Sequence, residues 1–154
     1  MFAIRPVSLA DIIWLEPAAV QAAWESLSEQ ERLRTVPAVV AHTTVSQLRT
    51  MLLQPETMVL VAQAGAWPIG FIVGAVAPDG ATGEPNGLLV VVWVAPAFRR
   101  QGVARRLQAA MEEIFRRAGV RKAKLWTGLH NQAAVRLAEG AGYRTEGLLG
   151  RKEI

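Results

Sequence analysis

The residues of this chain whose types and spacing suit a definite chemistry lie around Gly102. Arg99, Gly102 and Ala104 form the pattern Arg-x-x-Gly-x-Ala, directly before a segment with helical periodicity. The small side chains at 102 and 104 leave backbone N–H groups uncovered at the beginning of a helix, where the partial positive charge favours a phosphate group. The pattern is short and also occurs by chance in chains rich in arginine and alanine, so its neighbours carry much of its meaning.

Positive charge is concentrated in the same region. The net charge is +4, and nine of the 17 lysine and arginine residues lie between Arg99 and Lys124. Only Glu112 and Glu113 oppose them there. A basic region of this kind is expected to attract an anion, and the phosphates of a nucleotide would suit it. A solvated helix face explains part of the cluster equally well.

A buried strand and a helix are expected to position the loop. Residues 88–94 are apolar throughout, which is typical of a strand in the middle of a covered sheet. Apolar residues at helical spacing follow over 103–118, and Gly119 is expected to end that helix. The loop would therefore connect the end of a central strand to the N-terminus of a helix.

The remaining elements predict one mixed α/β domain over residues 1–154, a length that allows a substantial core. The other expected elements are, in order, a strand over 2–5, a helix from Ser8, a mixed segment over 26–41, a helix over 44–53, a β-hairpin over 58–77, a strand over 123–127, a helix from Asn131, and two last short strands over 143–146 and 148–154. Gly65 and Pro68 separate the two apolar runs of the hairpin.

Composition argues against several classes of protein. The absence of cysteine excludes disulfides, thiolate metal sites and a cysteine nucleophile, and no metal is expected. The 22 residues of 57–78 carry no charge and are long enough to cross a membrane, but their internal break favours the hairpin. No basic leader with an apolar segment begins the chain, so a cytoplasmic location is expected.

A second segment makes the resemblance to a known family specific. Residues 131–143 have the sequence NQAAVRLAEGAGY, which resembles the segment Asn-x-x-Ala-x-x-Leu-Tyr-x-x-x-Gly-Phe of the GNAT superfamily of N-acetyltransferases. The loop around Gly102 resembles that family's pyrophosphate loop, and residues 68–74 and 92–96 are similar to its third and fourth strands. The resemblance implies a mixed, mostly antiparallel central sheet with splayed fourth and fifth strands and helices on both faces.

The resemblance also implies acetyl-CoA as co-substrate, with contacts at defined positions. Backbone groups of Val92, Trp93 and Val94 would pair with the pantetheine amides where the two strands splay. Asn131 would hydrogen-bond the pantetheine arm, although a helix N-cap explains this residue equally well on local grounds. Backbone N–H groups would hold the pyrophosphate, with a glycine allowing close approach. The residues of this loop are Arg100, Gln101, Gly102, Val103, Ala104 and Arg105.

The usual catalytic residues of the family are missing. Many relatives carry a tyrosine that protonates the leaving thiolate, and this chain has Ala138 at that position. Many also carry a glutamate in the fourth strand as general base, and the matching residues 89–91 have no ionisable group. Tyr143 is no substitute by register, because it matches the core aromatic five residues later. The catalytic residues are therefore unknown from the sequence.

Three explanations stay open. Catalysis could rest on orientation and on polarisation of the carbonyl group, with solvent taking the protons. The acid and base could come from elsewhere, with His130 as the first candidate and Glu25, Glu29 and Glu84 after it. Alternatively, the protein binds acyl-CoA without turnover.

We therefore expect an N-acetyltransferase that transfers an acetyl group directly from acetyl-CoA to a primary amine, of a small molecule or a peptide, in a ternary complex. The alternative is a non-catalytic acyl-CoA-binding sensor or regulatory module. A nucleic-acid-binding domain ranks third, because no helix-turn-helix, aromatic RNA platform or zinc spacing is present. Neither nucleic acid nor membrane is expected as a partner, and the last strand would be available to pair across a homodimer. Trp93 and Trp126 fall on the two splaying strands, although core packing is the more common role of a strand tryptophan.

Overall fold

The computed structural model describes residues 1–147 and 149–154. The elements are β1 (Ala3–Pro6), the short 3-10 helix η1 (Leu9–Asp11), α1 (Ile12–Ser26), α2 (Glu29–Arg34), α3 (Pro37–Leu52), β2 (Thr57–Ala64), β3 (Trp67–Pro78), β4 (Pro85–Val94), the 3-10 helix η2 (Pro96–Phe98), α4 (Val103–Arg117), β5 (Lys122–Leu125) and α5 (Gln132–Gly140).

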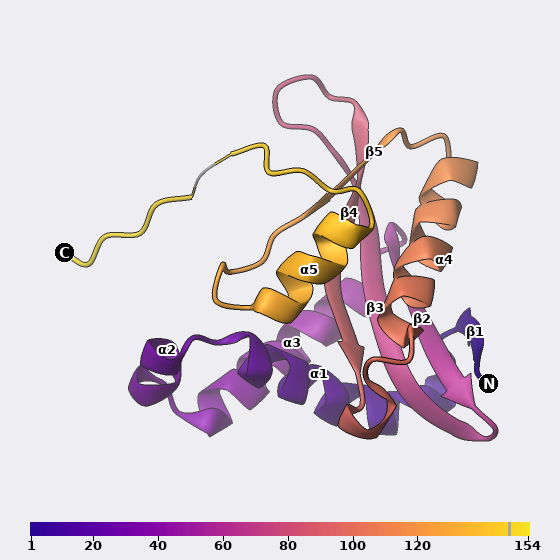
Figure 1. Cartoon of the computed structure of the whole chain (residues 1–154), viewed down its shortest axis with the longest axis horizontal. Coiled ribbons are helices and arrows are strands. Elements are labelled where there is room, and N and C mark those ends of the chain that lie inside the picture. Colours follow the sequence, from indigo (N-terminus) through magenta and orange to yellow (C-terminus); the bar gives the residue numbers. More distant parts are fainter. Residues whose placement is uncertain (148) are drawn as a thin grey trace.

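The strands form one mixed sheet that is covered by helices on both faces (Figure 1). Its order is β1-β2-β3-β4-β5, with every neighbouring pair antiparallel except β4 and β5, which are parallel. Helices α1 and α3 pack on one face, and α4 packs on the other with α5 beside it. This arrangement confirms the predicted fold class, a mixed and mostly antiparallel sheet with helices on both faces.

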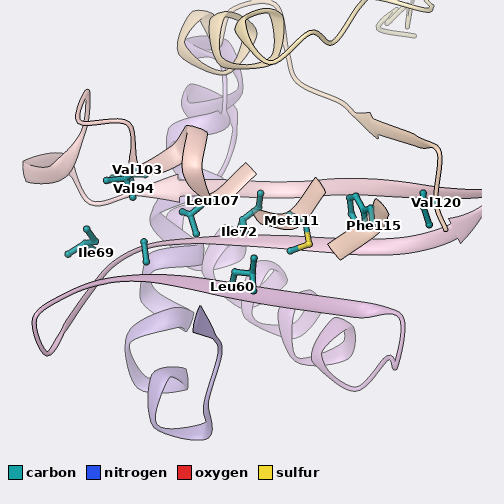
Figure 2. Close-up of a cluster of buried hydrophobic side chains, with 10 residues drawn as sticks. Leu60, Ile69, Ile72, Val94, Val103, Leu107, Met111, Phe115 and Val120 are labelled. Atoms are coloured by element: carbon teal, nitrogen blue, oxygen red, sulfur yellow. The ribbon is translucent and has the colours of Figure 1, made fainter. Parts of the chain in front are cut away.

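Helix α4 is fixed on the sheet by an apolar stripe (Figure 2). Leu107, Met111 and Phe115 follow one another at four-residue intervals, so they share one face of the helix and are almost fully buried. Glycines in the strands below let the helix approach closely. A Cβ atom at Gly74 would lie 2.6 Å from the Met111 sulfur, and one at Gly87 would lie 2.4 Å from the Phe115 ring. The position of the α4 N-terminus is therefore set by packing along the whole helix.

The opposite face has its own core. Helix α1 contributes Leu15 and the alanines at 18, 19 and 22, which pack with Leu48 of α3 against Phe71 and Trp93 of the sheet. The alanines allow α1 to lie close to the strands. Consequently the C-terminal end of α1 is held next to the last residues of β4.

Several expected boundaries were wrong. The helix expected over 44–53 begins earlier, at Pro37, because a proline is favoured in the first turn of a helix. The strand expected over 143–146 does not form. The last expected strand includes residue 148, which lies outside the described residues, and 149–154 form no strand. This tail is rich in charge and glycine, and Arg151 and Glu153 form ion pairs with Glu31 and Arg34 of α2.

Within the described residues, no helix combines the length and the apolar character that a membrane crossing requires. The uncharged stretch over 57–78 forms β2 and β3, joined by a tight turn at Gly65, whose φ is +58°. The predicted β-hairpin is therefore confirmed.

Candidate functional site

The fourth and fifth strands separate halfway along β4. They pair only from Asn86 with Lys122 to Leu89 with Leu125. Next to the last of these pairs, Val90 is an extra residue in β4, because Val73 lies opposite Val91 while Gly74 lies opposite Leu89. The second half of β4 continues along β3 and has no partner on its other side among the described residues. This is the splay that the family resemblance implied.

Backbone polar groups of β4 face the open edge at every second residue. The Ala95 N–H donates to the Ile69 carbonyl at 2.8 Å, so Ala95 belongs to a hydrogen-bonded pair with β3. Antiparallel pairs alternate, which turns the backbone groups of Trp93 toward β3 and those of Val92 and Val94 toward the open edge. The backbone groups that point to this edge are therefore those of Val92 and Val94, and the Val94 carbonyl accepts from the Arg99 side chain. The Trp93 side chain is buried in the core under α1.

The loop after β4 has the backbone geometry of an anion-binding cradle. Arg100 has a φ of +61° and is the one non-glycine residue with a positive φ in the described part of the chain. Gly102 has a φ of +80° and stands immediately before α4. Such left-handed residues beside ordinary ones turn successive N–H groups toward the same side. A non-glycine residue in this conformation is strained, and strain of this kind concentrates at functional sites.

The first turn of α4 adds further donors. The bond from the Arg106 N–H to the Gly102 carbonyl, at 3.1 Å, is the first of the helix, so the N–H groups of residues 103–105 have no acceptor within it. A Cβ atom at Gly102 would meet no atom within 4 Å, so the space in front of the loop is open. A phosphate group could approach these N–H groups without displacing a side chain.

Two arginines keep the region positive. Among the described residues, Arg100 and Arg105 take part in no ion pair, and both are exposed. Arg106 instead lies over the Phe2 ring, with 4.4 Å from the guanidinium carbon to the ring centre. Arg99 points away from the cradle and pairs with Glu25. The local charge therefore suits an anion.

At the other side of the open edge, the C-terminal end of α1 brings together residues that are far apart in the sequence. The Arg99 Nε donates to the Val94 carbonyl at 2.8 Å, and its Nη2 donates to the Glu25 carboxylate at 2.7 Å. The His130 Nε2 lies 2.7 Å from the Ser26 carbonyl. Because a carbonyl only accepts, Nε2 carries the proton, and Nδ1 is the basic nitrogen of the neutral ring.

An aromatic cluster lies beneath these residues. Trp14, Phe71 and Trp93 have ring centres 6.1–6.2 Å apart. The Arg99 guanidinium carbon lies 5.9 Å from the centre of the Trp93 ring. The Trp93 indole N–H is buried without a hydrogen-bond partner among the described residues. A buried donor without an acceptor is uncommon in folded proteins.

Other candidates from the sequence have different surroundings. The Asn131 side chain accepts from the Ala134 N–H at 3.3 Å and caps α5. Tyr143 donates to Glu112 at 2.9 Å, and burial together with this bond raises the pKa of Tyr143 above its ordinary value of 10.0. Tyr143 therefore ties the end of α5 to α4, and its hydroxyl proton is held by Glu112. Ala138 is buried.

Two carboxylates that the sequence offered do not join the site. Glu84 precedes β4 and therefore lies at the opposite end of that strand from Arg99, about 30 Å away at the usual rise per residue. Glu29 is exposed in the first turn of α2. The pairing of Glu25 with Arg99 was not foreseen, because no local sequence pattern links residues 74 positions apart. The described residues also contain no group of three histidines or carboxylates that could hold a metal ion.

Comparison with known proteins agrees with this geometry. The profile of the Acetyltransferase (GNAT) family matches residues 18–143, and the chain therefore belongs to this family. The family is one of acetyltransferases, and solved structures of acetyltransferases share the fold seen here.

Solved structures of similar fold include a Pyrococcus furiosus protein provisionally assigned as an acetyl transferase, at 18% identity and a TM-score of 0.86 over 100% of both chains. The aminoglycoside N-acetyltransferase AAC(6′)-Iy in complex with CoA has 19% identity and a TM-score of 0.77 over 99% of this chain and 95% of its own. A ribosomal-protein-alanine N-acetyltransferase from Brucella melitensis biovar Abortus 2308 has 16% identity and a TM-score of 0.75 over 100% of this chain and 99% of its own. At these identities the likeness establishes the fold.

Proposed function

We propose that this protein is an acetyl-CoA-dependent N-acetyltransferase that transfers an acetyl group directly to a primary amine in a ternary complex. The observation that carries the proposal is the meeting of two features at one end of β4. The backbone of Val92 and Val94 is unpaired with β5 along the splay, and the strained loop from Arg100 to Gly102 follows a few residues later. One extended ligand with amides at one end and phosphates at the other would satisfy both.

The residues present suit the co-substrate. The open edge of β4 offers the backbone groups of Val92 and the N–H of Val94 to amides, as a neighbouring strand would, while the Val94 carbonyl accepts from Arg99. The loop offers N–H groups, an open approach at Gly102 and the positive charge of Arg100 and Arg105. Asn131 keeps its side-chain NH₂ group free of its helix-capping role, which uses the side-chain oxygen, so this group could donate to the pantetheine arm.

Acetyl-CoA would supply the acyl thioester. The contribution of this chain is to hold the reacting groups together, because orientation by itself provides large rate factors, whereas a positioned acid or base adds about 10²–10⁴-fold. Ala138 and residues 89–91 provide neither acid nor base. His130 lies beside the opening, and its Nδ1 could take a proton from the amine.

The second candidate function is a sensor that binds acyl-CoA without turnover. It is favoured by the same absence of ionisable groups at residues 89–91 and 138. It shares the binding site with the first candidate and differs only in the reaction.

The test is a calorimetric titration with acetyl-CoA, CoA and ATP, followed by measurement of thiol release against a panel of amines. Binding of both CoA species but not ATP, with thiol release for at least one amine, is the expected result. Binding without thiol release across the panel favours the sensor. Absence of binding by any CoA species would contradict the proposal, because every part of it depends on the cradle and the open edge.

A further inference from the structure

The end of α1 contacts both sides of the opening between β4 and β5. Glu25 pairs with Arg99, which follows β4, and the adjacent Ser26 accepts from His130, which follows β5. The loop from β5 descends to this point before α5 begins (Figure 1). Two consecutive residues thus bridge the opening opposite the phosphate cradle. An acceptor that approaches the open edge from the side of α1 must pass them.

The Arg99 guanidinium occupies a position that has the features of a cation site. It contacts the Glu25 carboxylate, donates to the Val94 carbonyl and lies over the face of Trp93. A carboxylate, a backbone carbonyl and an aromatic face are the three kinds of group that stabilise an ammonium ion in proteins. One guanidinium separates the Glu25 carboxylate from the open edge of β4.

The surroundings of Glu25 are more ordered than those of an ordinary surface ion pair. Its second carboxylate oxygen accepts from the Gln21 side chain at 2.9 Å, so both oxygens are held. About two thirds of its side chain is covered. The Trp93 ring below is buried. A carboxylate whose two oxygens are both held in place is prearranged to bind a cation.

We propose that Glu25 binds the ammonium group of the acceptor at the open end of β4, and that Arg99 is a resident cation which the acceptor displaces. This inference rests on the proposed function, since it places the amine beside the edge where the thioester would lie. The acceptor would be an alkylammonium ion. Its ammonium end would be narrow enough to fit between the Glu25 carboxylate and the Trp93 indole. Glu25 is thereby the residue that selects cationic acceptors over neutral ones.

The first experiment measures amine binding without turnover. In ¹⁵N-labelled protein, n-propylamine is expected to shift the Arg99 Nε–H and Trp93 indole N–H resonances, whereas 1-propanol, its neutral counterpart, leaves them unchanged. Glu25→Gln is expected to raise the dissociation constant of n-propylamine at least tenfold. Arg99→Ala removes the competing cation and is expected to lower it. Equal responses to the amine and the alcohol, or unchanged affinity in Glu25→Gln, would overturn the proposal.

The second experiment uses turnover and a matched control. Glu29→Gln makes the same chemical change as Glu25→Gln, but at an exposed residue of α2. For an amine that releases thiol, Glu25→Gln is expected to raise its KM at least tenfold relative to Glu29→Gln, with the Kd for acetyl-CoA unchanged in both. A purely structural role for the ion pair would instead lower the melting temperature and leave this KM unaltered.

The two experiments separate the subsite from the proposed function. Binding of n-propylamine through Glu25 without binding of acetyl-CoA would support the cation site and contradict the proposed transferase function. Acetylation of amines from acetyl-CoA, with a KM for the amine that Glu25→Gln leaves unchanged, would support the transferase function and contradict the cation site.

Discussion

Replacing Gly102 by glutamate should weaken the binding of acetyl-CoA substantially while the fold persists. The φ of +80° costs a non-glycine residue about 1–2 kcal/mol, but a side chain there meets no atom within 4 Å, so no clash is added. In a protein of this size each kcal/mol corresponds to roughly 2–4 °C in melting temperature. The variant should therefore melt a few degrees lower and still unfold cooperatively.

The effect on binding comes from charge. Two like charges about 4 Å apart repel by about 4 kcal/mol at an effective dielectric constant of about 20. The cradle is exposed, so we halve this value to about 2 kcal/mol, which corresponds to about thirtyfold in the dissociation constant. Gly102→Gln has the same size and backbone strain without the charge, and the difference between the two variants isolates the electrostatic part.

The α4 helix supplies a matched control at its other end. Gly119 has a φ of +78°, and a Cβ atom there also meets no atom within 4 Å. Gly119→Glu should lose comparable stability and bind acetyl-CoA as the unaltered protein does. Isothermal titration at low ionic strength measures both variants. Binding by Gly102→Glu within threefold of Gly119→Glu would refute the placement of the phosphate at this loop.

Three further predictions concern stability. Arg100→Gly removes the strain of a φ of +61° and should raise the free energy of unfolding by about 1 kcal/mol, measured with urea; a decrease would contradict the strain argument. Asp11→Asn weakens the bonds at 2.7 and 2.8 Å to Arg5 and should cost about 2 kcal/mol. The Arg5 guanidinium holds the pKa of Asp11 well below its ordinary 3.8. The stabilisation by this ion pair is therefore complete above pH 3.8 and is lost as the pH falls below that value. Below this pH the stability of Asp11→Asn should decline less steeply than that of the unaltered protein in acid unfolding curves. Tyr143→Phe removes the bond to Glu112 and should cost about 1.5 kcal/mol in urea unfolding, and no loss would mean that solvent replaces the bond.

Much of the fold was predictable because it depends on local patterns. The four-residue spacing of Leu107, Met111 and Phe115 indicates one buried helix face wherever the helix packs. The break between two apolar runs at Gly65 likewise predicts a hairpin from local sequence, because glycine tolerates the positive φ that a tight turn needs. The loop before α4 belongs to this class, because its main features are a glycine and the first turn of a helix.

The errors at the C-terminal end of the chain came from segments whose structure depends on distant partners. The last residues of the chain were expected to form strands, yet the tail after Gly142 carries mostly charged residues and glycine and forms ion pairs with α2. Strand pairing needs apolar contacts with a neighbour as well as β propensity. No local pattern in the tail supplies those contacts.

The sequence by itself determined the type and order of most elements and the loop that opens α4, because these follow from neighbours a few residues apart. Only the tertiary structure located the expected splay beside Val90 and brought Glu25 to Arg99 and Ser26 to His130. Those partners are 74 and 104 positions apart, and their approach depends on how closely α1 and α4 pack on the two faces of the sheet. The distance between such residues depends on how the side chains of the whole core pack together, and no single segment of the sequence determines that packing.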